Sequence, residues 1–328
     1  MNLTNKGLIK GRDYVPGETP FVTVIGGANI DIHGRSNGKL RHKDSNPGTV
    51  HTSAGGVARN IAENLTRLGV DSRLISAVGD DHHGQMLVQL SREAGIDVQN
   101  VHEIAGARTS TYLSVLDETG DMLVGINDMS IIDRLTVELL KPQQAMISES
   151  ALIIVDANLP DDTLAWLTHT FATATIFADT VSSTKAPRLQ PYLPSIHTLK
   201  TGTIEIEALT GMEAQSDAQL RKLAGWLHGQ GVKRVYVTRG GRSIFYSTGN
   251  AQGFKDLPGT KREVHNAGGA GDAFLAGLAY AWLQSWPLDE SLRFALATAD
   301  VTLSHPDTSS PALSMSAVNR VMESRRAE

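Results

Sequence analysis

Residues 265–274 read His-Asn-Ala-Gly-Gly-Ala-Gly-Asp-Ala-Phe, and three of the four residues 268–271 are glycines. An apolar segment with helical spacing follows directly. Glycine lets backbone N–H groups turn toward one point because it lacks a Cβ atom, and a helix start adds unpaired N–H groups and partial positive charge. We therefore expect an anion cradle here, with Asp272 placed to take a proton from a hydroxyl that attacks a phosphoryl group. The simpler alternative is a glycine-rich helix cap.

The composition describes a soluble globular protein. The 328 residues are 41% hydrophobic and 20% charged, enough for one large α/β domain or two ordinary ones. A net charge of −5 argues against a nucleic-acid polymer as partner but leaves a nucleoside open. The absence of cysteine excludes disulfides, thiolate zinc sites and cysteine nucleophiles. Residues 1–20 are polar and no apolar run could span a membrane, so we expect a flexible leader, a cytoplasmic protein and no membrane partner.

Apolar runs alternate with amphipathic ones along most of the chain. This alternation predicts a mostly parallel sheet covered by helices on both faces, in one principal domain over residues 21–320. We expect strands at residues 21–25, 74–78, 152–156, 175–179, 197–200, 234–238 and 244–247. We expect helices at residues 57–68, 85–94, 163–173, 217–227, 270–283 and 288–303.

Two stretches break this pattern. Residues 32–53 are polar and loop-rich, whereas residues 109–116 and 122–126 alternate like an antiparallel hairpin. Both are too polar for the central sheet. We expect them to form a small inserted β lid, built from about residues 32–53 and 107–129. A small sheet with one apolar face is stabilised by pairing with its twin, so we also expect a homodimer through the lid.

Four motifs follow one another in order: Gly-Gly-Ala-Asn-Ile-Asp at residues 26–31, Ala-Gly-Gly-Val-Ala-Arg-Asn at 54–60, Ala-Val-Gly-Asp-Asp-His-His-Gly at 77–84, and Gly-Ala-Gly-Asp-Ala-Phe at 269–274. Together they resemble the ribokinase-like (PfkB) family of sugar and nucleoside kinases over roughly residues 20–320. Within the family, residues 44–48, 55–60, 109–113 and 126–129 are most similar to pseudouridine kinases. The resemblance implies a three-layer α/β/α sandwich with a small β lid. It also implies ATP-dependent phosphorylation of the primary (5′) hydroxyl of a nucleoside, with pseudouridine favoured over ribose or adenosine.

The resemblance also assigns roles around the phosphate. Asp272 would be the general base, with the amides of Gly269, Ala270 and Gly271 holding developing negative charge. Glu205 would organise Mg²⁺ and its waters, and whether K⁺ assists stays open. The residues expected to contact ATP are Thr238, Gly240, Gly241 and Gly268.

On the substrate side, Asp31 follows the first strand, where open α/β sheets gather ligands. Its carboxylate could accept hydrogen bonds from two ribose hydroxyls. Gly55 and Gly56 would let backbone approach the ribose, and Asn60 would bond a hydroxyl. A plain turn and a helix start are the simpler alternatives for these residues.

The remaining candidates lie on the lid and beside the pocket. Ser45 and Asn46 would reach the base or ribose, although an Asn-Pro-Gly turn explains them equally well. Ser110, Thr111 and Asn127 would meet the uracil edge, or else be solvated. The other polar candidates are Asn29, Asn158 and Lys185, of which Lys185 could neutralise phosphate charge.

The phosphate side departs from the family pattern. Gly202 replaces the asparagine of Asn-x-x-Glu, Ser243 replaces the last glycine of the nucleotide loop, and Gly268 replaces a threonine. A hydrogen bond to a charged group is worth about 1.5–3 kcal/mol, so losing two such contacts would slow turnover by roughly 10²–10⁴ if they were independent. A nucleoside-binding homologue with weakened phosphoryl transfer is therefore the second hypothesis. A Rossmann-type dehydrogenase is disfavoured because no Gly-x-Gly-x-x-Gly follows the first strand.

Overall fold

The computed structural model describes residues 20–240, 243–256, 268–305 and 307–324. The leader expected over residues 1–20 lies outside this range except for Pro20, and the expected nucleotide residue Gly241 lies outside it as well. Within the described residues, no helix is both long and apolar enough to cross a bilayer.

The main sheet has nine strands in the order β13-β12-β11-β10-β9-β8-β1-β4-β5. All neighbours from β5 to β11 pair in parallel, whereas β11, β12 and β13 form antiparallel pairs. The strands are β1 (Phe21–Ile25), β4 (Asp71–Gly79), β5 (Asp97–Ile104), β8 (Leu152–Asp156), β9 (Ile176–Asp179), β10 (Thr198–Gly202), β11 (Arg234–Thr238), β12 (Ser243–Ser247) and β13 (Gln252–Asp256). The sequence patterns did not predict β5 and β13, which lie at the two sheet edges.

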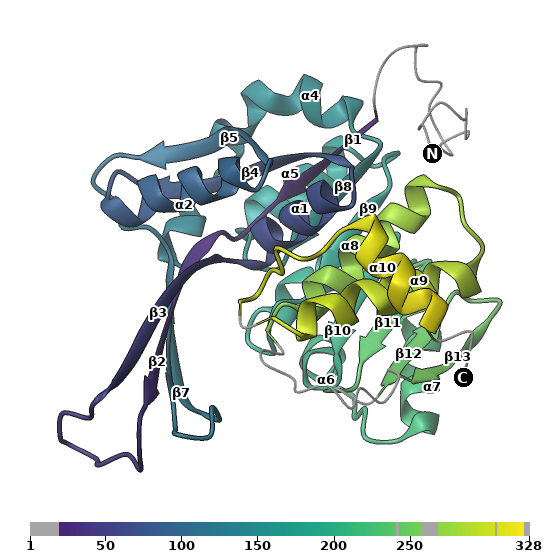
Figure 1. The fold of residues 1–328 in the computed structure, drawn as a ribbon. Helices are drawn as coiled ribbons and strands as arrows, with labels where there is room; N and C mark the ends of the chain where they lie inside the picture. The colour runs from purple at the N-terminus through teal and green to yellow at the C-terminus, as the bar shows by residue number, and fades with distance from the viewer. Residues whose placement is uncertain (1–19, 241–242, 257–267, 306, 325–328) are drawn as a thin grey trace.

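Helices cover both faces of this sheet (Figure 1). Alternate residues of one strand enter different cores: Val22 and Val24 pack in one hydrophobic cluster and Ile25 in the other. The helices are α1 (Val57–Arg67), α2 (His82–Glu93), α3 (Val137–Leu140), α4 (Gln144–Glu149), α5 (Asp161–Thr170), α6 (Thr203–Thr210), α7 (Asp217–Gly229), α8 (Ala270–Leu283), α9 (Leu288–Leu303) and α10 (Met315–Ser324), with 3₁₀ turns η1 (Ser130–Arg134), η2 (Lys141–Gln143) and η3 (Ala186–Ser195). A parallel sheet must be buried on both sides, and helices cover both faces here. The expected three-layer α/β/α sandwich is therefore confirmed.

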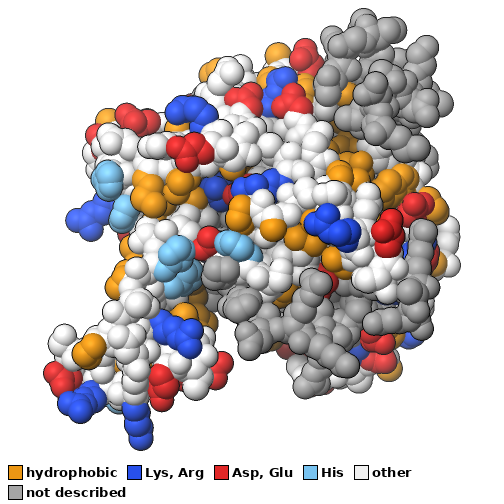
Figure 2. Space-filling view, in the orientation of Figure 1, with side chains coloured by type: hydrophobic (Ala, Val, Ile, Leu, Met, Phe, Trp, Pro, Cys, Tyr) orange, Lys and Arg blue, Asp and Glu red, His pale blue; other side chains and the backbone are white. Residues whose placement is uncertain are grey.

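A second sheet has four strands in the order β3-β2-β6-β7 and projects from the main body (Figure 1). It contains β2 (Asn29–Ser36), β3 (Gly48–Gly55), β6 (Thr111–Leu116) and β7 (Met122–Asp128). The stretch expected to be loop-rich, residues 32–53, therefore contains most of two eight-residue strands. Only residues 37–47, between these two strands, form a long loop. Charged side chains of both signs gather at the tip of the projecting sheet (Figure 2).

The two faces of this second sheet differ in chemistry. Asp31 and His33 alternate along β2 with Ile30 and Ile32, and successive side chains of a strand point to opposite faces. The face that carries Asp31 is polar. The opposite face, which we call the outer face, exposes apolar side chains: Val50 (75% exposed), Leu113 (39%), Val124 (50%) and Ile126 (61%).

Candidate active site

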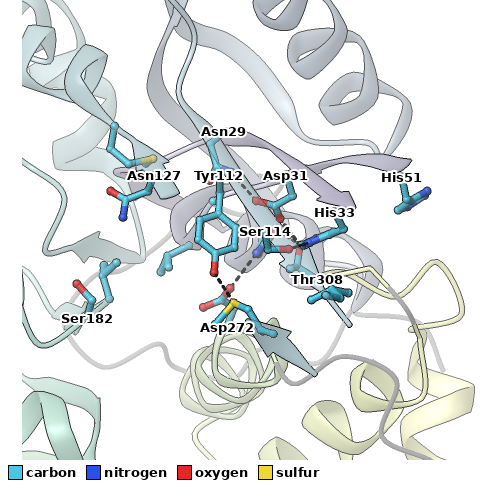
Figure 3. A pocket seen from close by; sticks show the side chains of 18 of the residues that line it. Asn29, Asp31, His33, His51, Tyr112, Ser114, Asn127, Ser182, Asp272 and Thr308 are labelled. Atoms are coloured by element: carbon cyan, nitrogen blue, oxygen red, sulfur yellow. Dashed lines mark hydrogen bonds between the residues drawn. The ribbon is translucent and has the colours of Figure 1, made fainter. Parts of the chain in front are cut away.

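A cavity of about 930 Å³ lies between the polar face of the four-stranded sheet and the start of α8 (Figure 3). Parts of the chain far apart in sequence meet there, because β2, β6, α1, α8 and the loops after β8 and β9 all contribute lining residues. Nine of the residues expected from sequence line it: Asn29, Asp31, Gly56, Asn60, Asn127, Asn158, Lys185, Gly268 and Asp272. The cavity thus places the expected sugar contacts and the expected general base in one space.

Asp272 lies in the first turn of α8 and is buried. The side-chain amide of Asn60 on α1 donates a hydrogen bond of 2.9 Å to Asp272 Oδ2. Burial, together with the nearby negative charge of Asp179, raises the pKa of Asp272 to about 8. A carboxylate with a pKa near the working pH is suited to accept a proton in a reaction.

Asp31 lies across the cavity from Asp272 (Figure 3). Asn29 Nδ2 donates to Asp31 Oδ1 at 2.6 Å, and burial raises the pKa of Asp31. Gly55, on the paired strand, does not line the cavity but makes room for this carboxylate, because a Cβ atom at position 55 would lie 2.1 Å from Asp31 Oδ2. The glycine is therefore required by the close approach of Asp31.

Asn158 and Lys185 line the cavity, and Lys185 Nζ donates a hydrogen bond to Asn158 Oδ1. The buried carboxylate of Asp156 fixes this edge by accepting hydrogen bonds from the backbone N–H groups of Gly27 (2.8 Å) and Asn158 (2.9 Å). Burial lowers the pKa of Lys185. Asn158 and Lys185 are thus held on the main domain, on the side of the cavity opposite the four-stranded sheet.

Besides Gly55, four expected substrate contacts do not line the cavity. Ser45 and Asn46 are in the exposed loop between β2 and β3, where Asn46 Oδ1 accepts from the Arg41 N–H at 2.8 Å and Nδ2 donates to the Arg41 carbonyl at 3.0 Å. These bonds hold Asn46 within the loop over residues 41–46, whereas Gly48 already belongs to β3. Ser110 is buried just before β6, and the Thr111 hydroxyl donates to the Thr109 carbonyl at 3.2 Å.

The sequence reasoning missed several lining residues on the polar face of the second sheet. His33, Tyr112 and Ser114 line the cavity, and His33 Nδ1 is 2.6 Å from Ser114 Oγ (Figure 3). The signal that could have found them is the period of two: His33 is two residues beyond Asp31, and Tyr112 pairs with Asp31 in the sheet register.

The expected phosphate residues surround the start of α6. Glu205 Oε2 accepts hydrogen bonds from the Gly202 N–H at 2.6 Å and from the Thr180 hydroxyl at 2.5 Å. A Cβ atom at position 202 would lie 3.1 Å from Glu205 Oε1, so glycine lets this carboxylate fold back over the helix start. Thr238 Oγ1 donates to the Thr201 carbonyl at 3.2 Å, and Gly240 follows with φ of 59°.

The expected anion cradle lies at the start of α8. Gly269 precedes its first helical residue and is followed by Ala270 and Gly271. The first N–H groups of a helix have no intrahelical partner and carry partial positive charge. Gly269 also lies against the backbone of Thr308, since a Cβ atom there would overlap the Thr308 carbonyl. No larger residue would fit at this position.

Comparison with known proteins identifies the family of this chain. Residues 19–315 match the model of the pfkB family carbohydrate kinase. This chain belongs to that family. It is 39% identical to the pseudouridine kinase of Escherichia coli (strain K12) over 306 residues, which cover 93% of this chain and 97% of that protein. It is 36% identical to an uncharacterised sugar kinase of the same strain over 314 residues, covering 96% and 86% of the two chains.

Solved structures show the same fold. A carbohydrate kinase from Agrobacterium tumefaciens, 29% identical, superposes with a TM-score of 0.78 and covers 93% of this chain and 97% of that one. The Arabidopsis thaliana ribokinase complexed with ribose and ATP, 21% identical, gives a TM-score of 0.80 with 93% and 99% coverage. The fold is therefore ribokinase-like, and this pfkB-family protein is an ATP-dependent kinase of the sugar and nucleoside class.

Proposed function

We propose that this kinase transfers the γ-phosphoryl group of ATP to the 5′ hydroxyl of a nucleoside, with pseudouridine as substrate. The observation that carries the proposal is the shared cavity, in which buried Asp31 and buried Asp272 face one space and Asn60 holds Asp272 in place. The identity to a pseudouridine kinase over nearly the whole chain supports the choice of nucleoside.

Asp31 would bind the ribose hydroxyls, and this would leave the primary hydroxyl beside Asp272. In the transfer, the O–H bond of that hydroxyl breaks and its proton goes to the Asp272 carboxylate. The oxygen forms a bond to the γ-phosphorus as the bond from phosphorus to ADP breaks. The amides of Gly269, Ala270 and Gly271 would stabilise the negative charge on the transferred group.

Glu205 would hold Mg²⁺ through water. Mg²⁺ is usually bound by one or two carboxylates together with substrate phosphates and waters. The residues present fit this pattern, because Glu205 supplies one carboxylate at the start of α6. When bound, the ion would neutralise charge on the ATP phosphates. Thr238, Gly240 and Gly268 would contact the nucleotide.

The four-stranded sheet would act as a lid over the sugar, which would exclude water and limit ATP hydrolysis. Its polar face contributes His33, Tyr112, Ser114 and Asn127 to the cavity. Its outer face would pair with the same face of a second copy to form a homodimer, because exposed apolar patches of this kind mark interaction sites.

A coupled assay of ADP release tests the proposal, with pseudouridine, uridine, adenosine and ribose offered separately and the product identified as the 5′-phosphate. Turnover that depends on pseudouridine supports it. Asp272→Asn should lower kcat by about 10²–10⁴-fold and leave nucleoside binding intact in calorimetry. No turnover with any of the four substrates at high enzyme and Mg²⁺, with tight nucleoside binding, would instead favour the binding homologue.

A further inference from the structure

Lys200 is a buried cation that no expectation from the sequence included. It lies near the end of β10, and its Nζ is 3.0 Å from Asp179 Oδ2 at the end of the neighbouring strand β9. Among the described residues, Asp179 is the only carboxylate that forms an ion pair with it. A buried charge is costly unless it is paired, and Asp179 supplies the opposite charge here.

The ammonium lies against the first turn of α8. A Cβ atom at position 271 would be 2.5 Å from Lys200 Nζ and 3.0 Å from its Cε. Only glycine at this position lets the lysine approach the backbone beside Asp272. Gly271 therefore serves two purposes, one in the anion cradle and one in admitting a cation next to the expected general base.

Several charges surround Asp272. Asp179 and Asp156 disfavour its ionised form, whereas Lys200 and the hydrogen bond from Asn60 favour it. Asp31 and Lys185 line the same cavity. Burial by itself lowers the pKa of Lys200, but Asp179, Asp272 and Glu205 together raise it above its ordinary value, so the lysine keeps its charge.

We propose that Lys200 is a positioning residue for phosphoryl transfer: its ammonium, which lies against the first turn of α8, favours the ionised form of Asp272 that accepts the hydroxyl proton. This rests on the proposed function, in which Asp272 is the general base. Lys200 acts through Asp272 and does not itself take the proton.

The two members of the Lys200–Asp179 pair should act in opposite directions. Lys200→Met removes the positive charge beside Asp272. We expect the acid limb of the kcat profile, the pH range in which kcat falls as Asp272 is protonated, to move up by about 1–3 pH units. At pH 7 this lowers kcat by roughly 10–1,000-fold, with little change in the KM for nucleoside. Asp179→Asn removes a like charge, so the limb should move down. The asparagine Oδ1 can still accept the Val181 N–H, a bond of 2.7 Å in the wild type.

A merely structural ion pair predicts something different. Both variants break the same contact, so loss of structure would shift both profiles in the same direction or lower both without a shift. Either result would overturn the proposal. If Lys200→Met does not fold, Lys200→Gln takes its place, because it removes the charge and keeps a polar end, and it should move the limb in the same upward direction.

A second measurement separates this inference from the proposed function. Carbon-13 labelling of aspartate carboxyl groups allows Asp272 to be titrated by NMR in the free protein, with Asp272→Asn assigning the signal. The titration should move up in Lys200→Met and down in Asp179→Asn, whether or not any nucleoside is phosphorylated. Absence of nucleoside-dependent ADP release from the wild type would contradict the proposed function, and an unmoved carboxyl titration would contradict the role of Lys200.

Discussion

Asn60 Nδ2 donates to Asp272 Oδ2 at 2.9 Å, across 212 residues of sequence and between the starts of two helices, α1 and α8. The side-chain oxygen Asn60 Oδ1 in turn accepts hydrogen bonds from the hydroxyls of Thr308 (3.4 Å) and Ser309 (3.3 Å). The amide orientation is therefore fixed from both ends. Asp272 is held in one position before any substrate arrives.

Replacing Asn60 by alanine should weaken catalysis more than folding. A hydrogen bond to a charged group contributes about 1.5–3 kcal/mol, so kcat/KM for nucleoside should fall by roughly 10–100-fold. Asn64→Ala is the matched control, because Asn64 is buried on the same helix and donates to the Asn60 backbone carbonyl at 2.8 Å. It should lower the melting temperature and leave kcat/KM near the wild-type value. Equal kinetic losses in both variants would refute the specific role of Asn60.

Gly55→Ala should impair substrate binding. The new Cβ would lie 2.1 Å from Asp31 Oδ2, so the carboxylate must leave its position. We expect the dissociation constant for nucleoside in calorimetry to rise by about 10-fold or more, since at least one hydrogen bond to a charged group is lost, with ATP affinity retained. Gly225→Ala, in an exposed and open part of α7, is the control and should slightly raise stability. Unchanged nucleoside affinity in Gly55→Ala would argue against Asp31 as a sugar ligand.

Glu205→Gln should change the requirement for Mg²⁺. Glutamine can still accept the Gly202 N–H bond that Glu205 accepts at 2.6 Å, but it lacks the negative charge. Outer-shell partners of metals contribute about 10–100-fold in affinity, so the Mg²⁺ concentration at half-maximal rate should rise by a factor in that range. Glu207→Gln on the same helix, whose carboxylate bonds the Ala214 N–H at 2.7 Å, should leave the Mg²⁺ titration unchanged. The same titration curve for both variants would remove Glu205 from the metal site.

Activity should fall as pH decreases. Burial and Asp179 raise the pKa of Asp272 to about 8, and a general base works only when it is deprotonated. kcat/KM for nucleoside should therefore decrease by about tenfold per pH unit below that pKa and level off above it. Steady-state rates at saturating MgATP between about pH 6 and 9 check this. A flat profile over that range would mean that Asp272 does not limit the reaction as a base.

The outer face should control assembly. Ile126 (61% exposed) and Val124 (50%) lie on β7 among other apolar side chains. Ile126→Lys places a charge in the expected interface, and we expect a dimer to become a monomer in sedimentation velocity. Ile204→Lys is the control, because Ile204 is 68% exposed on α6, away from this sheet. A monomeric wild type, or a dimer that survives Ile126→Lys, would contradict pairing through this face.

The strand and helix order of the main domain could be predicted from the sequence. Periodicity is a local property: runs such as Phe21–Ile25 and Leu152–Asp156 are buried on both faces, and their composition shows it. Edge strands gave weaker signals. β5 and β13 carry half-exposed and polar residues, so their composition does not separate them from loops.

The candidate site was predictable only in part. Motifs in sequence order identified Asp31, Asn60 and Asp272, because each belongs to a short local pattern. His33 and Tyr112 were not predicted as site residues, because whether they line the cavity depends on which face of their strand turns toward it. The sequence also placed Asn46 near the substrate, whereas its hydrogen bonds to Arg41 hold it within the loop beyond β2.

By itself, the sequence determined the layered α/β architecture and the glycine-rich start of α8, since both follow from the chemistry of neighbouring residues. Only the tertiary structure decided which charged and polar side chains surround Asp272. Lys200, Asp179 and Asn60 come from β10, β9 and α1, and the order of strands in the sheet brings them together. The physical reason is that electrostatic interactions depend on distance in space, which sequence separation does not measure.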